Sequence, residues 1–349
     1  MMVDCIIPSQ AGLPGEFFNS IVEFRISAFL RCLFDVVRSK CALTGAMTWA
    51  AEAEMKGQVL AIGLLGLALL APRTSSAQQP WENIPRLNIY QVAYPVEWNG
   101  KTIMLGARLQ VPTDAHGKMP AVIMMHGTGG IRYSGVYYAA ALNGAGITTL
   151  EVDQWGGRGL PGGASSRPAH LGDNLGDIAG AYRLLRARPD IDTSRIGLFG
   201  ESMGGIESLL MMTQHNSDAV LGPGVHMRAA VALYPICWLY NHVQGADFRD
   251  LVDAPIRIMV GSADDYDGGG DACRTMIGEL SLQDGAHVSL RVFPGATHIF
   301  DSFTAPYQFN DPGANRRHGG VIHVRPDPEA RQQARDDMVS FFRAALEAK

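Results

Sequence analysis

Apolar and polar residues alternate with strand-like and helix-like periods in turn from residue 89 onward. Short apolar runs such as AVIMM at residues 121–125 are typical of strands buried on both faces. Between these runs, apolar residues recur three or four positions apart, as they do on one face of a helix. The pattern predicts strands at residues 89–98, 103–111, 121–125, 147–152, 196–199, 229–234, 256–260 and 288–293. It predicts helices at residues 174–188, 203–212, 275–282 and 329–346.

This order of elements predicts an α/β fold, because strands that alternate with helices form a mostly parallel sheet with helices on both faces. The first two strands should pair as an antiparallel hairpin, since the turn dipeptide Asn99-Gly100 separates them. Pro95 indicates that the first strand is at an edge of the sheet or is interrupted. Residues 154–172 and 302–325 are predicted loops, and loops of this length are usually functional or mobile.

Residues 55–77 resemble a secretory signal peptide. Lys56 supplies a positive charge, an apolar run follows at residues 59–71, and Ser75 and Ala77 stand at the −3 and −1 positions of a cleavage site. The apolar run is shorter than the ~20 residues that span a bilayer, although an uncleaved anchor or a buried helix are alternatives. We expect a domain of residues 78–349, secreted or periplasmic, with no membrane span after cleavage.

Residues 1–54 precede Met55, where a signal peptide would be expected to begin. We interpret them as an extension that results from a start assigned too far upstream. An N-terminal targeting extension is the alternative.

The composition is that of a globular protein, with 47% hydrophobic and 18% charged residues. A net charge of −5 argues against a nucleic-acid binder and against a protein that binds anionic membranes, since both need an excess of Lys and Arg over Asp and Glu. The predicted mature domain contains two cysteines, Cys237 and Cys273. In an oxidising compartment they could form one disulfide, or they could be two separate buried thiols.

The segment Gly200-Glu201-Ser202-Met203-Gly204 follows a predicted strand and precedes a predicted helix. In that context the glycines permit a sharp turn that exposes the serine Oγ, and the helix N-terminus favours developing negative charge. We predict that Ser202 is a nucleophile. The alternative is a serine that only caps the helix.

A serine hydroxyl needs a base to accept its proton. His298 follows the last predicted strand, and an aspartate that follows the preceding strand would orient the imidazole, in the chain order Ser, Asp, His. Asp264 is the preferred acid and Asp265 its rival. For His298 the alternative is a solvated loop histidine.

The acidic run Asp264, Asp265, Asp267 and Asp271 could instead be a calcium loop or a solvated acidic loop, although the full calcium-ligand spacing is absent.

Acyl transfer also needs donors for an oxyanion. The N–H of Met203 is one candidate, and the loop His126-Gly127-Thr128 supplies the second, with Thr128 preferred and Gly127 next. His126 itself is interpreted as structural. The sequence contains no zinc-type H-E-x-x-H, no C-x-x-C and no phosphate loop, so no metal or nucleotide cofactor is implied.

From about residue 92 to the C-terminus the chain resembles the dienelactone hydrolase family of the α/β-hydrolase fold. The resemblance rests on MMHGTGG (124–130), DIDTSRIGLFGESMGG (190–205), ALYPIC (232–237), MVGSADD (259–265) and FPGATHIFD (293–301). It implies Ser202 as nucleophile, Asp264 as acid and His298 as base. Dienelactone hydrolases proper carry cysteine as the nucleophile, so Ser202 favours a general carboxylic-ester hydrolase.

The resulting hypothesis is an exported serine esterase of small-molecule esters. A second hypothesis is a hydrolase of polymeric esters, such as a polyester or an acylated polysaccharide. A third is a non-catalytic binding protein built on the same fold. The sequence leaves the substrate and the oligomeric state open.

Overall fold

The computed structural model describes residues 85–113 and 117–347. The chain divides between Ala77 and Gln78 into two units, and all described residues belong to the second. The predictions for residues 1–54 and 55–77 therefore lie outside the described residues. Within the described part of the chain, no helix has both the length and the apolar character needed to cross a bilayer.

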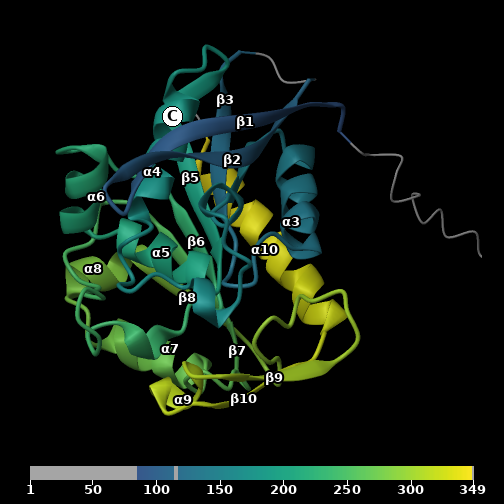
Figure 1. The fold of residues 1–349 in the computed structure, drawn as a ribbon, viewed down its shortest axis with the longest axis vertical. Helices are drawn as coiled ribbons and strands as arrows, with labels where there is room; N and C mark the ends of the chain where they lie inside the picture. Colours follow the sequence, from purple (N-terminus) through teal and green to yellow (C-terminus); the bar gives the residue numbers. More distant parts are fainter. Residues whose placement is uncertain (1–84, 114–116, 348–349) are drawn as a thin grey trace, which may run out of the picture. The chain divides into compact units, whose positions relative to one another are not determined.

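Eight of the described strands form one sheet in the order β1-β2-β4-β3-β5-β6-β7-β8 (Figure 1). They are β1 (Leu87–Trp98), β2 (Lys101–Pro112), β3 (Met119–Met125), β4 (Thr148–Asp153), β5 (Ile191–Glu201), β6 (Ala230–Leu233), β7 (Ile256–Gly261) and β8 (Val288–Phe293). β1 pairs antiparallel with β2, and β2 with β4, whereas β3 to β8 are mutually parallel. The predicted mostly parallel sheet with an antiparallel N-terminal hairpin is confirmed.

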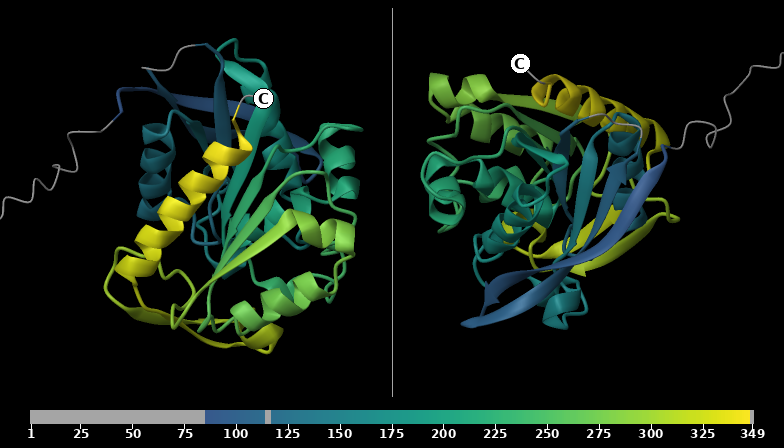
Figure 2. Two further views of the ribbon diagram at one scale, coloured as in Figure 1. Left: turned by 180° about the vertical axis from the view of Figure 1, so that it is seen from behind. Right: turned by 90° about the horizontal axis from the view of Figure 1, so that it is seen from above.

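Helices cover both faces of this sheet. α4 (Leu175–Arg186) and α5 (Met203–Met211) lie in front of it in Figure 1. Viewed from behind in Figure 2, α3 (Tyr133–Gly144) and α10 (Pro328–Ala345) lie in front of the opposite face. The remaining helices are α6 (Gln214–Leu221), α7 (Gly270–Gly278), α8 (Leu282–His287) and α9 (Ala314–Arg317), with 3-10 turns η1 (Gly156–Arg158), η2 (Ala164–Ser166) and η3 (Cys237–Leu239).

The opening hairpin follows from its turn residues. Asn99 and Gly100 both have positive φ, at 50° and 70°, which matches the right-handed twist of the strands that they connect. Trp98 therefore pairs directly with Lys101. β1 is an edge strand, which is where Pro95 is tolerated.

Two predicted segments differ from the structure. Residues 302–325, predicted as a loop, contain the antiparallel strands β9 (Tyr307–Asp311) and β10 (Gly320–Val324), which lie beside α9 at the lower end of Figure 1. The predicted helix 275–282 is divided, because the Ser281 hydroxyl accepts a hydrogen bond from the Asp284 N–H and so starts α8.

The cysteine alternative is resolved by geometry. Cys237 of η3 and Cys273 of α7 form a disulfide, with their Cα atoms 4.9 Å apart. The bond connects the segment after β6 with the segment after β7.

Removing this disulfide should lower stability. In the chain-entropy model, a cross-link between residues 36 positions apart raises the free energy of the unfolded chain by about 4 kcal/mol and so stabilises the folded protein. We expect the double variant Cys237→Ala/Cys273→Ala to unfold at a lower denaturant midpoint than the oxidised protein. The wild type under reducing conditions should match the variant. Equal midpoints for the oxidised and reduced protein would contradict the expectation.

Candidate active site

Ser202 lies on a sharp turn between β5 and α5. Its backbone is in an unusual region, with φ 51° and ψ −109°, which an L-residue adopts only where the surroundings enforce it. The surroundings are tight: a Cβ on Gly204 would collide with the Met125 carbonyl oxygen of β3, and one on Gly200 with the Gly204 backbone. These two glycines therefore allow the turn that the sequence predicted.

The structure brings Ser202, His298 and Asp264 together in one hydrogen-bond chain. Ser202 Oγ lies 2.9 Å from His298 Nε2, and His298 Nδ1 lies 2.6 Å from Asp264 Oδ2. Because Nδ1–H donates to the carboxylate, Nε2 is left to accept the serine proton. The imidazole and the carboxylate are buried, and Tyr234 and Tyr266 pack against the imidazole ring.

Asp265 lies elsewhere. Its Oδ2 accepts a hydrogen bond from the His323 N–H at 2.7 Å and lies 3.1 Å from His323 Nδ1, so it anchors β10. Asp264 keeps its other oxygen on the Tyr266 N–H, 3.0 Å away. Of the two candidates left open by the sequence, Asp264 is the one within reach of His298.

The remaining carboxylates of the acidic run have separate partners. Asp267 accepts hydrogen bonds from the Trp238 and Gly269 N–H groups, and Asp271 pairs with Arg274. Across residues 85–113 and 117–347, no group of three or more His, Cys, Asp or Glu side chains is arranged to hold a metal ion.

The loop after β3 is fixed by His126. The Gln154 N–H donates to His126 Nε2 at 3.1 Å, so Nδ1 carries the proton and donates to the Gly127 carbonyl at 2.7 Å. Burial lowers the pKa of His126, which keeps this neutral form. The Gly130 N–H also donates to the Gly127 carbonyl. Because a peptide is planar, fixing that carbonyl also fixes the direction of the Thr128 N–H.

Thr128 and Met203 both border the space in front of Ser202. Met203 is the first residue of α5, where the N–H has no acceptor within the helix. Gly127 also lies beside the nucleophile, since a Cβ added to it would lie 3.3 Å from the Ser202 Cβ. All three residues predicted for the oxyanion thus surround Ser202.

The family model of the dienelactone hydrolase family matches residues 105–346. The chain belongs to the dienelactone hydrolase family. This confirms the resemblance seen in the motifs and places the chain in a family of carboxylic ester hydrolases with the α/β-hydrolase fold.

Individual relatives of this dienelactone hydrolase family member are distant. Uncharacterized protein Rv2307c of Mycobacterium tuberculosis is 30% identical over 161 residues, which cover 44% of this chain. The chain spans 56% of that relative's length.

Two solved structures share the fold. A dienelactone hydrolase-like promiscuous phosphotriesterase from metagenomic libraries has a TM-score of 0.53 at 18% identity, over 75% of this chain and 99% of that chain. Thermogutta terrifontis esterase 2 phosphoramylated by tabun has a TM-score of 0.51 at 16% identity, over 76% of this chain and 98% of that chain.

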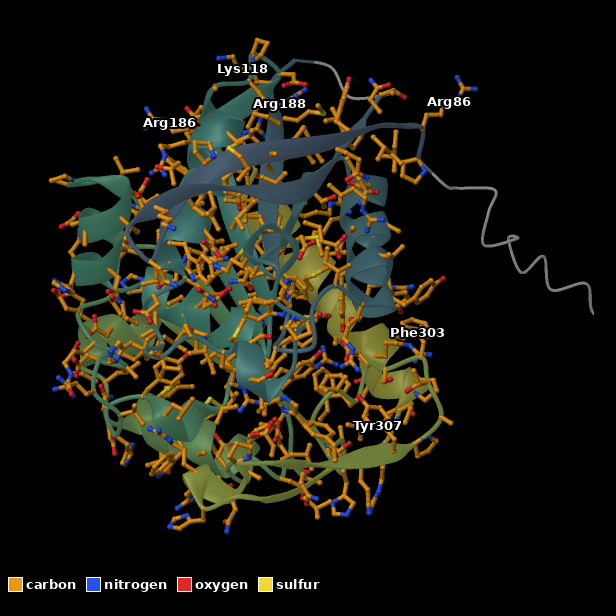
Figure 3. The ribbon with its side chains drawn as sticks, viewed as in Figure 1. Arg86, Lys118, Arg186, Arg188, Phe303 and Tyr307 are labelled. Carbon is orange, nitrogen blue, oxygen red and sulfur yellow. A yellow bond between two sulfur atoms is a disulfide. The ribbon has the colours of Figure 1, made fainter. Side chains whose placement is uncertain are left out.

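Ser202 of this family member opens onto two cavities. The larger has a volume of about 640 Å³, and the residues that line it include Trp238, Leu239 and His242. The smaller has a volume of about 290 Å³, and the residues that line it include His298, Phe309 and Arg132. Arg132 donates a hydrogen bond to the hydroxyl of Tyr307, the first residue of β9, which is labelled in Figure 3.

Sequence reasoning missed the residues that shape these cavities. Arg167, Asp311 and Tyr307 belong to the two segments predicted as loops. The length of those segments was the available signal, but it did not identify which side chains meet.

The basic residues labelled at the top of Figure 3, such as Arg186, lie at the opposite end of the molecule from Tyr307.

Buried carboxyl groups surround the turn at Ser202. Glu201 and Asp301 are buried, and burial raises the pKa of each. On α5, burial raises the pKa of Glu207 to about 8, and its carboxyl accepts hydrogen bonds from Gln154 and Asn174. These groups favour their protonated forms in the folded protein.

Glu207 should make stability depend on pH. The pKa of Glu207 in the folded state exceeds the ordinary value of 4.5. Its contribution to the free energy of unfolding is therefore complete below pH 4.5 and is lost as pH rises through about 8. The variant Glu207→Gln imitates the protonated form and should lose less stability between pH 5 and pH 9 than the wild type. Urea unfolding at both pH values measures this, with the exposed Glu279→Gln as control. An equal loss of unfolding free energy in the wild type and in both variants would contradict this prediction.

Proposed function

We propose that this protein hydrolyses carboxylic esters through an acyl-enzyme formed on Ser202. The observation that carries the proposal is the hydrogen-bond chain from Ser202 Oγ through His298 to the buried Asp264. Family membership supports the same reaction class. A buried carboxylate on Nδ1 stabilises the imidazolium that forms when His298 accepts a proton.

The first half-reaction forms the acyl-enzyme. Ser202 Oγ attacks the ester carbonyl carbon while its proton passes to His298 Nε2. The carbonyl oxygen becomes an oxyanion, which the N–H groups of Met203 and Thr128 stabilise, with the N–H of Gly127 as the further candidate. The tetrahedral intermediate collapses, the alkoxy group leaves, and it takes the proton from His298 to become the alcohol.

The second half-reaction regenerates the enzyme. Water attacks the acyl carbon as His298 Nε2 accepts one of its protons, and the same donors hold the second oxyanion. Collapse breaks the bond to Ser202 Oγ, which regains the proton from His298, and the carboxylic acid is released. Each cycle consumes one ester and one water.

We also propose that the protein acts outside the cytoplasm, as a secreted or periplasmic enzyme. The disulfide between Cys237 and Cys273 supports this site of action, since such bonds persist in oxidising compartments. The signal-like pattern at residues 55–77 supports it independently.

A polymeric ester is the second candidate substrate. It is favoured by an exposed aromatic pair beside Arg132: Tyr133 and Phe303 are 64% and 42% exposed, with ring centroids 4.7 Å apart. Exposed aromatic rings at the rim of a site can pack against a chain that is too large to enter it.

Ser202→Ala should abolish hydrolysis of short p-nitrophenyl esters without changing the melting temperature, because the variant removes only the nucleophile. The exposed Ser340→Ala serves as control. The same enzymes should be assayed on a solid polyester and an acylated polysaccharide, since faster turnover of a polymer would favour the second candidate. Undiminished turnover by Ser202→Ala would refute the nucleophile. Failure of a fluorophosphonate probe to label wild-type Ser202 would favour a binding protein.

Asp264→Asn and Asp265→Asn should separate the two adjacent carboxylates. Loss of the Asp264 charge should lower kcat by about 10⁴-fold, because the imidazole loses its orienting partner. Loss of the Asp265 charge should change kcat only a few-fold, since that side chain contacts His323. Steady-state kinetics on one activated ester measures both. Equal effects would contradict the assignment of Asp264.

A further inference from the structure

Arg167 extends across the entrance to Ser202 and connects two segments that are remote in sequence. Its Nε donates to Thr128 Oγ1 at 3.3 Å, in the loop after β3. Its Nη1 donates to Asp311 Oδ1 at 2.8 Å, and Nη2 donates to Asp311 Oδ2, at the end of β9. One side chain therefore spans the distance from the predicted oxyanion loop to the β9–β10 hairpin.

Asp311 is buried where it pairs with the Arg167 guanidinium, and several other groups hold it in place. The Asp311 side chain is 3% exposed, and the guanidinium binds it through two parallel hydrogen bonds, a geometry that fixes both groups. The Tyr266 hydroxyl also donates to Asp311 Oδ2, at 2.9 Å, and the Gly313 N–H to Oδ1, at 2.6 Å. The Tyr266 ring in turn packs against His298, with ring centroids 4.4 Å apart.

The two cavities meet along this line of side chains. Thr128, Ala164, Arg167, Ser202 and Tyr266 line both the larger and the smaller cavity. Ser202 therefore opens onto both spaces, and the Arg167 side chain borders both of them. Apolar and polar side chains line both spaces, for example Trp238 and His242 in the larger one and Phe309 and Arg132 in the smaller one, so the two differ mainly in volume.

We propose that Arg167, held in place by Asp311, is a specificity-determining wall that divides the site into two subsites. The substrate class that fits is an ester with a bulky apolar group on one side of the carbonyl and a compact group on the other. This rests on the proposed esterase function, since an ester bound at Ser202 has an acyl part and an alkoxy part. Each part must enter a separate cavity while the wall stands, and the smaller cavity has less than half the volume of the larger, so it restricts the second group more tightly.

Four esters test the wall: ethyl acetate, benzyl acetate, ethyl phenylacetate and benzyl phenylacetate. Ethyl acetate carries no ring. Benzyl acetate carries one ring on the alkoxy side, and ethyl phenylacetate carries one on the acyl side. Benzyl phenylacetate carries one ring on each side. We expect the wild type to prefer one of the single-ring esters over the double-ring ester by tenfold or more in kcat/KM. Arg167→Ala should join the cavities and reduce that preference by about tenfold, the range that pocket shape controls. Arg274→Ala, which alters an exposed ion pair on α7, is the matched control and should keep the wild-type preference.

The ratios of kcat/KM between the esters distinguish a residue that determines specificity from one that only supports the structure. A uniform fall of kcat/KM for all four esters in folded Arg167→Ala, with unchanged ratios, would overturn the proposal. So would a wild type that accepts the double-ring ester as readily as the single-ring ones. If Arg167→Ala does not fold, the near-isosteric Asp311→Asn releases the guanidinium and should shift the ratio in the same direction. A wild type that hydrolyses none of the esters and resists fluorophosphonate labelling would instead refute the proposed function itself.

Discussion

The close approach of the Ser202 turn to the end of β3 is the constraint on which the site depends. Gly204 packs so tightly against the Met125 carbonyl that no side chain fits between them, and a Cβ on Gly127 would lie only 3.3 Å from the Ser202 Cβ. This contact places the nucleophile beside the loop that His126 holds rigid. Parallel pairing of β3, β5, β7 and β8 through their neighbours then brings the serine, aspartate and histidine loops to one edge of the sheet.

The sequence was sufficient for the sheet and for two of the three site positions. Alternation and the Asn99-Gly100 turn predicted β1 and β2, and buried apolar runs predicted the other strands of the main sheet. The turn chemistry around Ser202 and the position of His298 identified side chains that the fold brings together. It could not separate Asp264 from Asp265, because adjacent residues in a loop point in different directions. That choice depends on His323, whose strand was not predicted, since a strand of five residues is too short to carry a clear periodic signal.

Long-range pairings were beyond the reach of pattern alone. Arg167 and Asp311 are 144 residues apart, and each is in a segment without helical or strand periodicity of its own. The cysteine pair was left open for a related reason, since only the Cα separation decides whether a bond can form. In both cases the information is in the packing of loops on the sheet edge rather than in local propensity.

The β9–β10 excursion leaves and rejoins the fold at nearly the same point. The Arg325 N–H donates to Thr297 Oγ1, and the Asp327 N–H donates to the Phe300 carbonyl, so both ends of the segment are fastened beside His298. An insert with adjoining ends can change in length or composition while its attachment points stay fixed. Natural variation could therefore retune what this enzyme accepts by exchanging a surface module, with the reacting histidine left undisturbed.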